Sequence, residues 1–176
     1  FQVFSLGKGA EFGLGKIASI FPDKSKPIKK QRAGLVKGIS EDGAKFLSPR
    51  DGRLLNLTPE KSYEIQKNLG ADFIYLLDIC GSITDDKKIT KRDMERTGRW
   101  YQRFLDLRKK QRNNQEIFGI IQGGLFKDLR LTATKIVNEL PTFGIAVGGA
   151  LGRTKSEMFK IISWVNQKID WSRPHH

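Results

Sequence analysis

The chain has 176 residues, 38% of them hydrophobic, which is typical of a soluble globular protein with a substantial core. Its 32 Lys and Arg residues against 19 Asp and Glu residues give a formal net charge of +13, which favours a polyanionic partner such as nucleic acid, although a basic surface can also serve solubility alone. No apolar run approaches the roughly 18 residues of a transmembrane helix, the single cysteine cannot form an internal disulfide, and the sequence shows no zinc-ligand cluster. We therefore expect no membrane partner and a cytoplasmic setting.

The N-terminal part of the sequence contains one strand-like stretch and one irregular segment. The chain starts at Phe1 inside a strand-like pattern and stops at His176 without a capped element, so we expect an internal piece of a longer protein. Residues 9–38 are rich in Gly and Lys and lack periodicity, which predicts a basic surface insertion. This segment is not a phosphate-binding loop, because "GAEFGLGKI" is one residue too long and Ile17 stands where Ser or Thr should bind magnesium.

Helix and strand patterns alternate from Thr58 onward. Thr58 and Pro59 are typical of a helix start, and Gly70 fits the end of that helix at Leu69. The apolar run at residues 71–80 predicts a strand that is buried on both faces. A helix is predicted next, at residues 91–110, with an apolar stripe formed by Met94, Thr97, Tyr101, Phe104 and Leu105.

The second half of the chain repeats this alternation. Strands are predicted at residues 117–121 and 143–147, and a helix at residues 126–140 lies between them until Pro141 stops it. Thr154 and Glu157 have the spacing of a capping box that starts a last helix. The alternation predicts right-handed crossovers and a parallel sheet, either an open doubly wound sheet or part of a (β/α)8 barrel, since a complete barrel takes about 250 residues.

Small and polar residues follow each predicted strand. In either closure these carboxyl ends are where function is expected. The ends carry Asp78 and Cys80, then Gln122-Gly123-Gly124, then Gly148-Gly149.

These residue types could read the edge of guanine. A carboxylate accepts from the neighbouring N1–H and 2-amino donors, while an amide NH2 and a backbone N–H donate to O6. Each residue also has a structural explanation: Asp78 as a helix cap or turn residue, Cys80 as a small buried side chain, and the glycines as turn residues. The residues alone leave both interpretations open.

The motifs are similar, in order, to those of the tRNA-guanine transglycosylases, also called queuine tRNA-ribosyltransferases. The resemblance is carried by "FQVFSLGK", "SPRDGRLLNLTPEKSYEIQKNLGAD", "MERTGRW", "FGIIQGG" with "DLR", and "GIAVGG" with "SEMF". It implies that residues 1–176 are the central part of a single (β/α)8 catalytic domain, with residues 9–38 as an insertion. It also implies an enzyme that replaces the wobble guanine of tRNA with queuine or a 7-deazaguanine precursor through a covalent enzyme–RNA intermediate, on a nucleotide flipped from its stack.

The resemblance also implies a role for six residues in binding the base. Asp78 would hold N1–H and the 2-amino group, Gln122 and the Gly149 N–H would donate to O6, and the Ala150 carbonyl would reach the substituent of the incoming base. Phe1 would stack on the base and Cys80 would lie beside it.

Several parts of the family pattern are expected outside this chain. The resemblance places the first strands, a proton-accepting aspartate, the nucleophilic aspartate and the zinc site of three cysteines and a histidine beyond residues 1–176. The chain is therefore expected to hold no catalytic nucleophile and no cofactor, although zinc is expected in the full-length protein. "DICGSIT" departs from the family's usual sequence there, and "GGALGRTK" is one residue shorter than usual, so the resemblance leaves open which base is preferred.

Two other functions fit the sequence. One is a non-catalytic tRNA-binding partner subunit of a transglycosylase, which an aspartate after the strand following Pro174 would argue against. The other is a basic α/β module that binds RNA without specificity. A homodimer or a heterodimer is compatible with each of these functions.

Overall fold

The structure, a computed structural model, describes residues 35–111, 113–150 and 152–176. The chain forms two units, Phe1–Thr58 and Pro59–His176. Phe1 and residues 9–34 of the predicted insertion lie outside the described residues.

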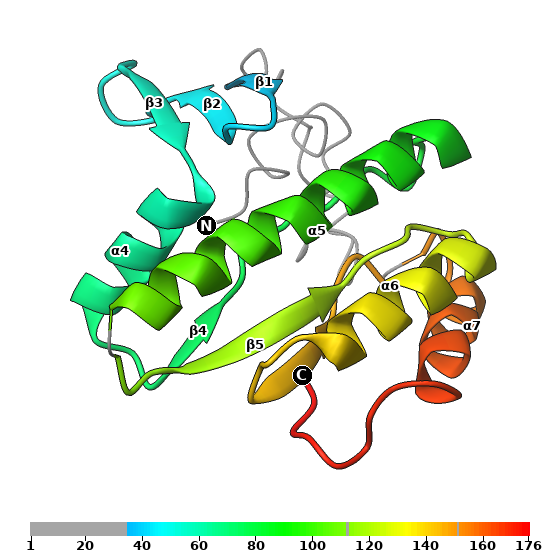
Figure 1. Ribbon diagram of the computed structural model, residues 1–176. Coiled ribbons are helices and arrows are strands. Elements are labelled where there is room, and N and C mark those ends of the chain that lie inside the picture. The colour runs from blue at the N-terminus through cyan, green and yellow to red at the C-terminus, as the bar shows by residue number, and fades with distance from the viewer. Residues whose placement is uncertain (1–34, 112, 151) are drawn as a thin grey trace, which may run out of the picture. The chain divides into compact units, whose positions relative to one another are not determined.

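The described part of the first unit is a small antiparallel sheet. Strands β1 (Val36–Ile39), β2 (Ala44–Leu47) and β3 (Leu54–Leu57) pair in the order β1-β2-β3 (Figure 1). Residues 36–38, the end of the segment predicted as a surface insertion, therefore belong to strand β1 although their sequence shows no strand periodicity. A tight turn, in which Ser40 N donates to Gly43 O at 2.9 Å, brings β1 beside β2. The strand can therefore form although its short sequence does not alternate between apolar and polar residues.

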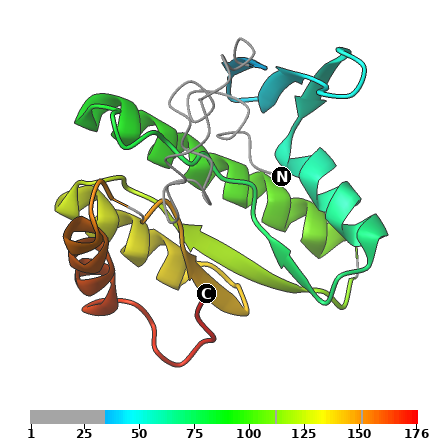
Figure 2. The same ribbon diagram turned by 180° about the vertical axis from the view of Figure 1, so that it is seen from behind.

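The second unit contains the predicted alternation of helices and parallel strands. Its elements, in chain order, are α4 (Pro59–Leu69), β4 (Phe73–Tyr75), α5 (Lys87–Lys110), β5 (Glu116–Ile121), α6 (Lys127–Glu139), β6 (Gly144–Val147) and α7 (Lys155–Asn166). The strands form a parallel sheet in the order β4-β5-β6. Figures 1 and 2 show α5 and α6 along the same side of this sheet.

Two predicted boundaries in this unit differ from the structure. Strand β4 has three residues, whereas residues 71–80 were predicted as strand. The chain leaves the sheet after Leu76, and Ile79 N donates at 3.0 Å to the hydroxyl of Thr97 on α5, so a side chain replaces the strand's hydrogen-bond partner. Helix α5 begins four residues before the predicted Lys91, because Asp86 caps it by accepting from Ile89 N at 2.8 Å.

The core lies between this sheet and the helices. The predicted stripe of α5 is buried, and it packs with sheet residues such as Ile74, Ile117 and Ile145 and with α6 residues such as Leu129 and Val137. On the strands, Phe118 makes an edge contact with Phe73 and stacks with Tyr75. Successive side chains of a strand point to opposite faces of the sheet, and apolar side chains pack on both faces here. The strands therefore have a continuous apolar sequence.

The chain returns to the sheet after α7. The backbone of Pro174 and His176 hydrogen bonds with Ile145 and Val147 of β6 in a parallel bridge at 2.8–2.9 Å. Segments that follow one another along the chain, β4, β5, β6 and then residues 174–176, therefore lie next to one another in the sheet. The described residues form a mixed α/β fold with parallel strands, and within them no closed barrel is seen.

Candidate functional site

The ends of β4, β5 and β6 bring together most of the residues predicted to form a site. Asp78 and Gln122 are in direct contact, because the Gln122 amide Nε2 donates to the Asp78 Oδ2 at 2.5 Å. Gln122 is buried, with 6% of its surface exposed, and Asp78 is half-buried. Two residues 44 positions apart thus place a donor and an anionic acceptor side by side.

The turn after β6 passes close to the same amide. A Cβ atom added to Gly149 would lie 2.7 Å from Gln122 Oε1 and 3.5 Å from Cys80 Sγ, and the φ angle of Gly149 is +53°. Any larger residue at this position would collide with Gln122 and adopt a strained backbone. The glycine therefore brings the backbone of the β6 turn against Gln122 and Cys80.

The glycines after Gln122 serve packing between strand and helix. Gly123 has a φ angle of +128°, and a Cβ atom there would lie 2.7 Å from the backbone N of Arg130 on α6. The turn that carries Gln122 therefore packs directly on the first turn of α6, which a side chain would prevent.

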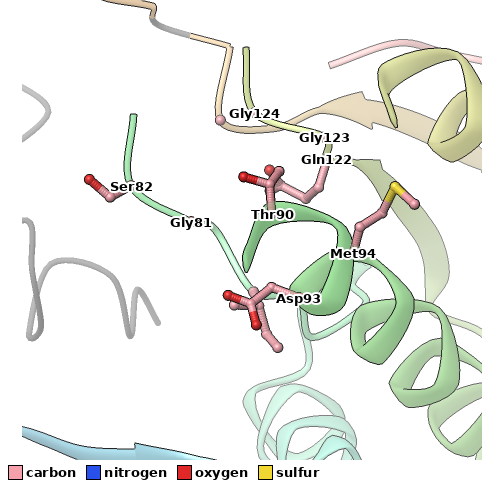
Figure 3. A pocket seen from close by; sticks show the side chains of 10 residues that line it. Gly81, Ser82, Thr90, Asp93, Met94, Gln122, Gly123 and Gly124 are labelled. Carbon is pink, nitrogen blue, oxygen red and sulfur yellow. The ribbon is translucent and has the colours of Figure 1, made fainter. Parts of the chain in front are cut away.

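A hollow of about 320 Å³, including its solvent-filled mouth, opens beside Gln122 (Figure 3). Thr90, Asp93 and Met94 reach it from α5, and Gly81 and Ser82 line it from the segment after β4. Asp93 is 8% exposed and pairs with Arg92 at 2.9 Å and with Arg96 at 3.6 Å. Its enclosed part amounts to only about 20 Å³, room for about one water molecule, and polar groups line it on several sides.

The sheet is supported behind Gln122 by a buried tyrosine. The hydroxyl of Tyr101 on α5 donates to the carbonyl of Ile120 at 2.7 Å. Burial and, to a lesser extent, the charge of Asp78 raise the pKa of Tyr101 well above its usual value, although the bond to Ile120 acts in the opposite direction. Tyr101 is therefore neutral at physiological pH and holds the strand that carries Gln122.

Arg130 was not among the residues predicted for the site. Its side chain is fully buried on α6 and donates to four backbone carbonyls at the ends of β5 and β6, those of Ile121, Gly124, Gly148 and Gly149. A signal was present in the sequence, because Phe126, Arg130, Ala133 and Val137 share one helical stripe. An arginine on an apolar stripe indicates a buried charge that needs partners.

The structure thus brings together Asp78, Cys80, Gln122 and Gly149. Ala150 follows Gly149 directly in the β6 turn and is half-buried, and Phe1 lies outside the described residues. Asp78 is not the cap of the following helix, because Asp86 caps α5.

Neither a metal cluster nor a membrane span emerges from the described ranges. Residues 35–111, 113–150 and 152–176 contain no group of three or more His, Cys, Asp or Glu that could hold a metal ion, so the expected zinc is assigned to none of them. No helix within these ranges is long and apolar enough to cross a membrane.

Comparisons with known proteins identify relatives of the chain. A family model described as queuine tRNA-ribosyltransferase matches residues 25–176, starting inside the segment predicted as an insertion. Proteins named queuine tRNA-ribosyltransferase from Protochlamydia amoebophila and Chlamydia pneumoniae are 38% and 37% identical over 176 residues. These alignments cover 100% of this chain but only 43% and 45% of the two relatives, so the chain spans less than half their length.

Proposed function

Because the chain belongs to the queuine tRNA-ribosyltransferase family, we propose that it supplies the base pocket of an enzyme that exchanges the wobble guanine of tRNA. The incoming base is queuine or a related 7-deazaguanine, and the exchange passes through a covalent enzyme–RNA intermediate. The family membership supports the reaction class, and the site geometry supports the base.

The contact between Asp78 and Gln122 carries this proposal. With Nε2 of Gln122 beside Oδ2 of Asp78, the protein presents a donor followed by the two acceptors of one carboxylate. Guanine presents O6 as acceptor followed by N1–H and the 2-amino group as donors. The two arrays are complementary in order, and the second hydrogen of the amide can reach O6 while the first stays on Asp78.

The β6 turn completes the recognition of the base. The N–H of Gly149 is the second donor for O6, and the carbonyl of Ala150 faces the substituent that distinguishes the incoming base from guanine. Cys80 lies beside Gly149 and bounds the plane of the base. Phe1 is proposed as the stacking residue.

Base exchange needs a nucleophile that the pocket residues do not provide. In the proposed reaction an aspartate oxygen bonds to ribose C1′ as the C1′–N9 bond breaks, and the incoming base then displaces that oxygen. Asp78 is occupied by the base edge, so it is assigned to binding and not to attack. We propose that the nucleophile lies outside residues 1–176.

The order of the strands supports a (β/α)8 barrel as the complete fold. Strands β4, β5 and β6 are neighbours in chain order, and residues 174–176 continue the series beside β6. A doubly wound sheet reverses its order at a switch point, which these strands do not do.

Guanine binding to wild-type chain and to Asp78→Ala tests the pocket by titration calorimetry. Removal of the carboxylate leaves two donors of the base without a charged acceptor, so we expect the binding free energy to weaken by about 1–3 kcal/mol. Asp106→Ala, on the exposed face of α5, is the matched control and keeps the wild-type affinity. Equal guanine affinity for Asp78→Ala and wild type would instead favour a basic module without a base pocket.

Exchange of labelled guanine into tRNA tests the assignment of the nucleophile. The chain of residues 1–176 is expected to bind guanine without incorporating it. Incorporation above the protein-free background would place the nucleophile inside this chain.

A further inference from the structure

Arg130 has an unusual environment for a charged side chain. It is fully buried, and burial lowers its pKa to about 10, while the nearby Cys80 has the smaller, opposite effect. A pKa of this size keeps the guanidinium protonated at neutral pH. A buried charge is costly unless its donors are satisfied, and among the described residues Arg130 forms no ion pair with a carboxylate.

Backbone carbonyls satisfy the guanidinium instead. Nε donates to Gly124 O at 2.8 Å, and Nη1 donates to Ile121 O at 3.1 Å and to Gly148 O at 2.6 Å. Nη2 donates to Gly149 O at 2.8 Å. One rigid planar group thus joins the turn after β5 to the turn after β6.

These carbonyls bracket the two groups that are proposed to donate to O6. The carbonyls of Ile121 and Gly124 lie before and after Gln122 along the chain. The carbonyls of Gly148 and Gly149 lie before and after the N–H of Gly149. A trans peptide points its N–H opposite to the preceding carbonyl. Because the Gly148 carbonyl is aimed at Arg130, the Gly149 N–H is aimed away from it.

Without this anchor both turns would lose the bonds that fix the direction of their carbonyls. Gly123, Gly124 and Gly149 all have positive φ angles, and glycine restricts its own backbone less than any residue with a side chain. Donors whose direction is fixed before the ligand arrives bind it without the cost of ordering them.

We propose that Arg130 is a positioning residue that presets the Gln122 amide and the Gly149 N–H for O6 of the base. This inference rests on the proposed guanine pocket. Arg130 touches neither the base nor the ribose, and it acts only through the backbone that it holds.

The test compares guanine with 6-thioguanine, which keeps N1–H and the 2-amino group but replaces O6 with a weakly accepting sulfur. Wild-type chain is expected to prefer guanine by about tenfold. Arg130→Lys keeps a positive charge but cannot span four carbonyls with one rigid fork. We expect its guanine affinity to fall toward its 6-thioguanine affinity, leaving a preference of less than about twofold.

Arg173→Lys is the matched control. Arg173 also donates to backbone carbonyls, those of Leu140 and Thr142 beyond the other end of α6. This variant is expected to lower the melting temperature and to keep the tenfold preference. A merely structural role for Arg130 would lower both affinities by the same factor, which would overturn the inference.

The outcomes separate the inference from the function on which it rests. No preference for guanine in wild type would overturn both the pocket and the role of Arg130. A preference that Arg130→Lys retains would overturn the role alone.

A measurement on wild type covers the case in which Arg130→Lys does not fold. Amide relaxation of the ligand-free chain should give order parameters of about 0.85 at Gly148 and Gly149. Values below about 0.6 that rise only when guanine is added would show that Arg130 does not preset the turn.

Discussion

The neutrality of residue 122 is set by its contact with Asp78. A side-chain amide at this position donates to a carboxylate at 2.5 Å within a largely buried setting. A cation there would bind Asp78 more tightly and would compete with the base that is proposed to bind there, whereas an anion would repel the Asp78 carboxylate. Glutamine is long enough to reach Asp78 from the end of β5 and carries no charge.

Gln122→Glu is expected to destabilise the fold in a pH-dependent way. Two carboxyl groups would share the space of one hydrogen bond, so the free energy of unfolding should fall by about 1–3 kcal/mol at pH 7. Such a pair binds a proton more readily when folded than when unfolded. The lost stability should therefore return as the pH falls below about 5.

Chemical denaturation at several pH values measures this effect, and the chain offers a matched control. Gln102 donates to Asp106 at 2.7 Å on the exposed face of α5, and Gln102→Glu should cost no more than about 0.5 kcal/mol. An equal loss in the two variants, or a loss independent of pH, would contradict a buried Asp78–Gln122 contact.

Residue types at strand ends made part of this site predictable. Asp78, Cys80, Gln122 and Gly149 could be proposed because parallel strands end at one edge, and in the structure these four residues lie close together. Arg130 was missed because its role depends on which carbonyls it meets, and those belong to turns 6 to 19 residues away along the chain. Periodicity places a side chain on a helix face but does not identify its partners.

At the scale of elements, the link between α6, α7 and the edge of the sheet is held by one charged loop. Asp170 accepts from Ser172 Oγ at 2.6 Å and from Arg173 Nε at 2.7 Å, and Arg173 donates to the carbonyl of Leu140 just after α6. These bonds to Ser172 and Arg173 lower the pKa of Asp170 to about 2. The loop then leads into Pro174, where pairing with β6 begins.

Asp170 is expected to contribute to stability above pH 4 and to lose that contribution in acid. A carboxyl group whose pKa is lower in the folded chain stabilises the fold above its unfolded pKa, near 3.8, and the effect disappears as the pH falls toward about 2. The melting temperature of Asp170→Asn, measured from pH 6 down to about pH 2, should therefore fall less steeply than that of wild type. Parallel acid profiles of the two proteins would contradict this role.

The boundaries of elements were predictable where a local signal exists. Proline has no backbone N–H, so it suits the first position of a helix and cannot continue one. The structure confirms that α4 begins at Pro59 and that α6 ends just before Pro141. Thr154 also caps α7 as predicted, although the Glu157 carboxylate accepts from Arg153 N and not from the cap residue. The early end of β4 was not predictable, because the competing bond from Ile79 goes to Thr97 on another element.

At the scale of the whole molecule, positive charge is spread along the chain and is dense on α5. This helix has ten Lys and Arg residues against three Asp and Glu residues. Several of them form ion pairs, including Lys91 with Glu95 and Arg103 with Glu60. A net charge of +13 nevertheless favours association with a phosphate backbone.

Binding to tRNA is expected to weaken strongly with salt. Each neutralised phosphate releases condensed counterions, so raising the salt concentration from about 50 to 200 mM should lower tRNA affinity about 100-fold or more. Filter binding across this range measures the slope, and guanine affinity under the same conditions should change little. A weak salt dependence for tRNA would argue against a basic RNA-binding surface.

The closure of the sheet could not be predicted from periodicity alone. Alternation fixes parallel strands and right-handed crossovers, but an open sheet and a barrel share both features. The aromatic contacts of Phe73 and Tyr75 with Phe118 are equally compatible with either closure.

In the proposed pocket, the side-by-side placement of Asp78 and Gln122 would also determine which purine is rejected. Adenine would turn its 6-amino group toward the amide NH2 and its unprotonated N1 toward the carboxylate, so donor would meet donor and lone pair would meet anion. Rejection of the wrong nucleobase would then come from the same two side chains that hold the right one, without steric exclusion.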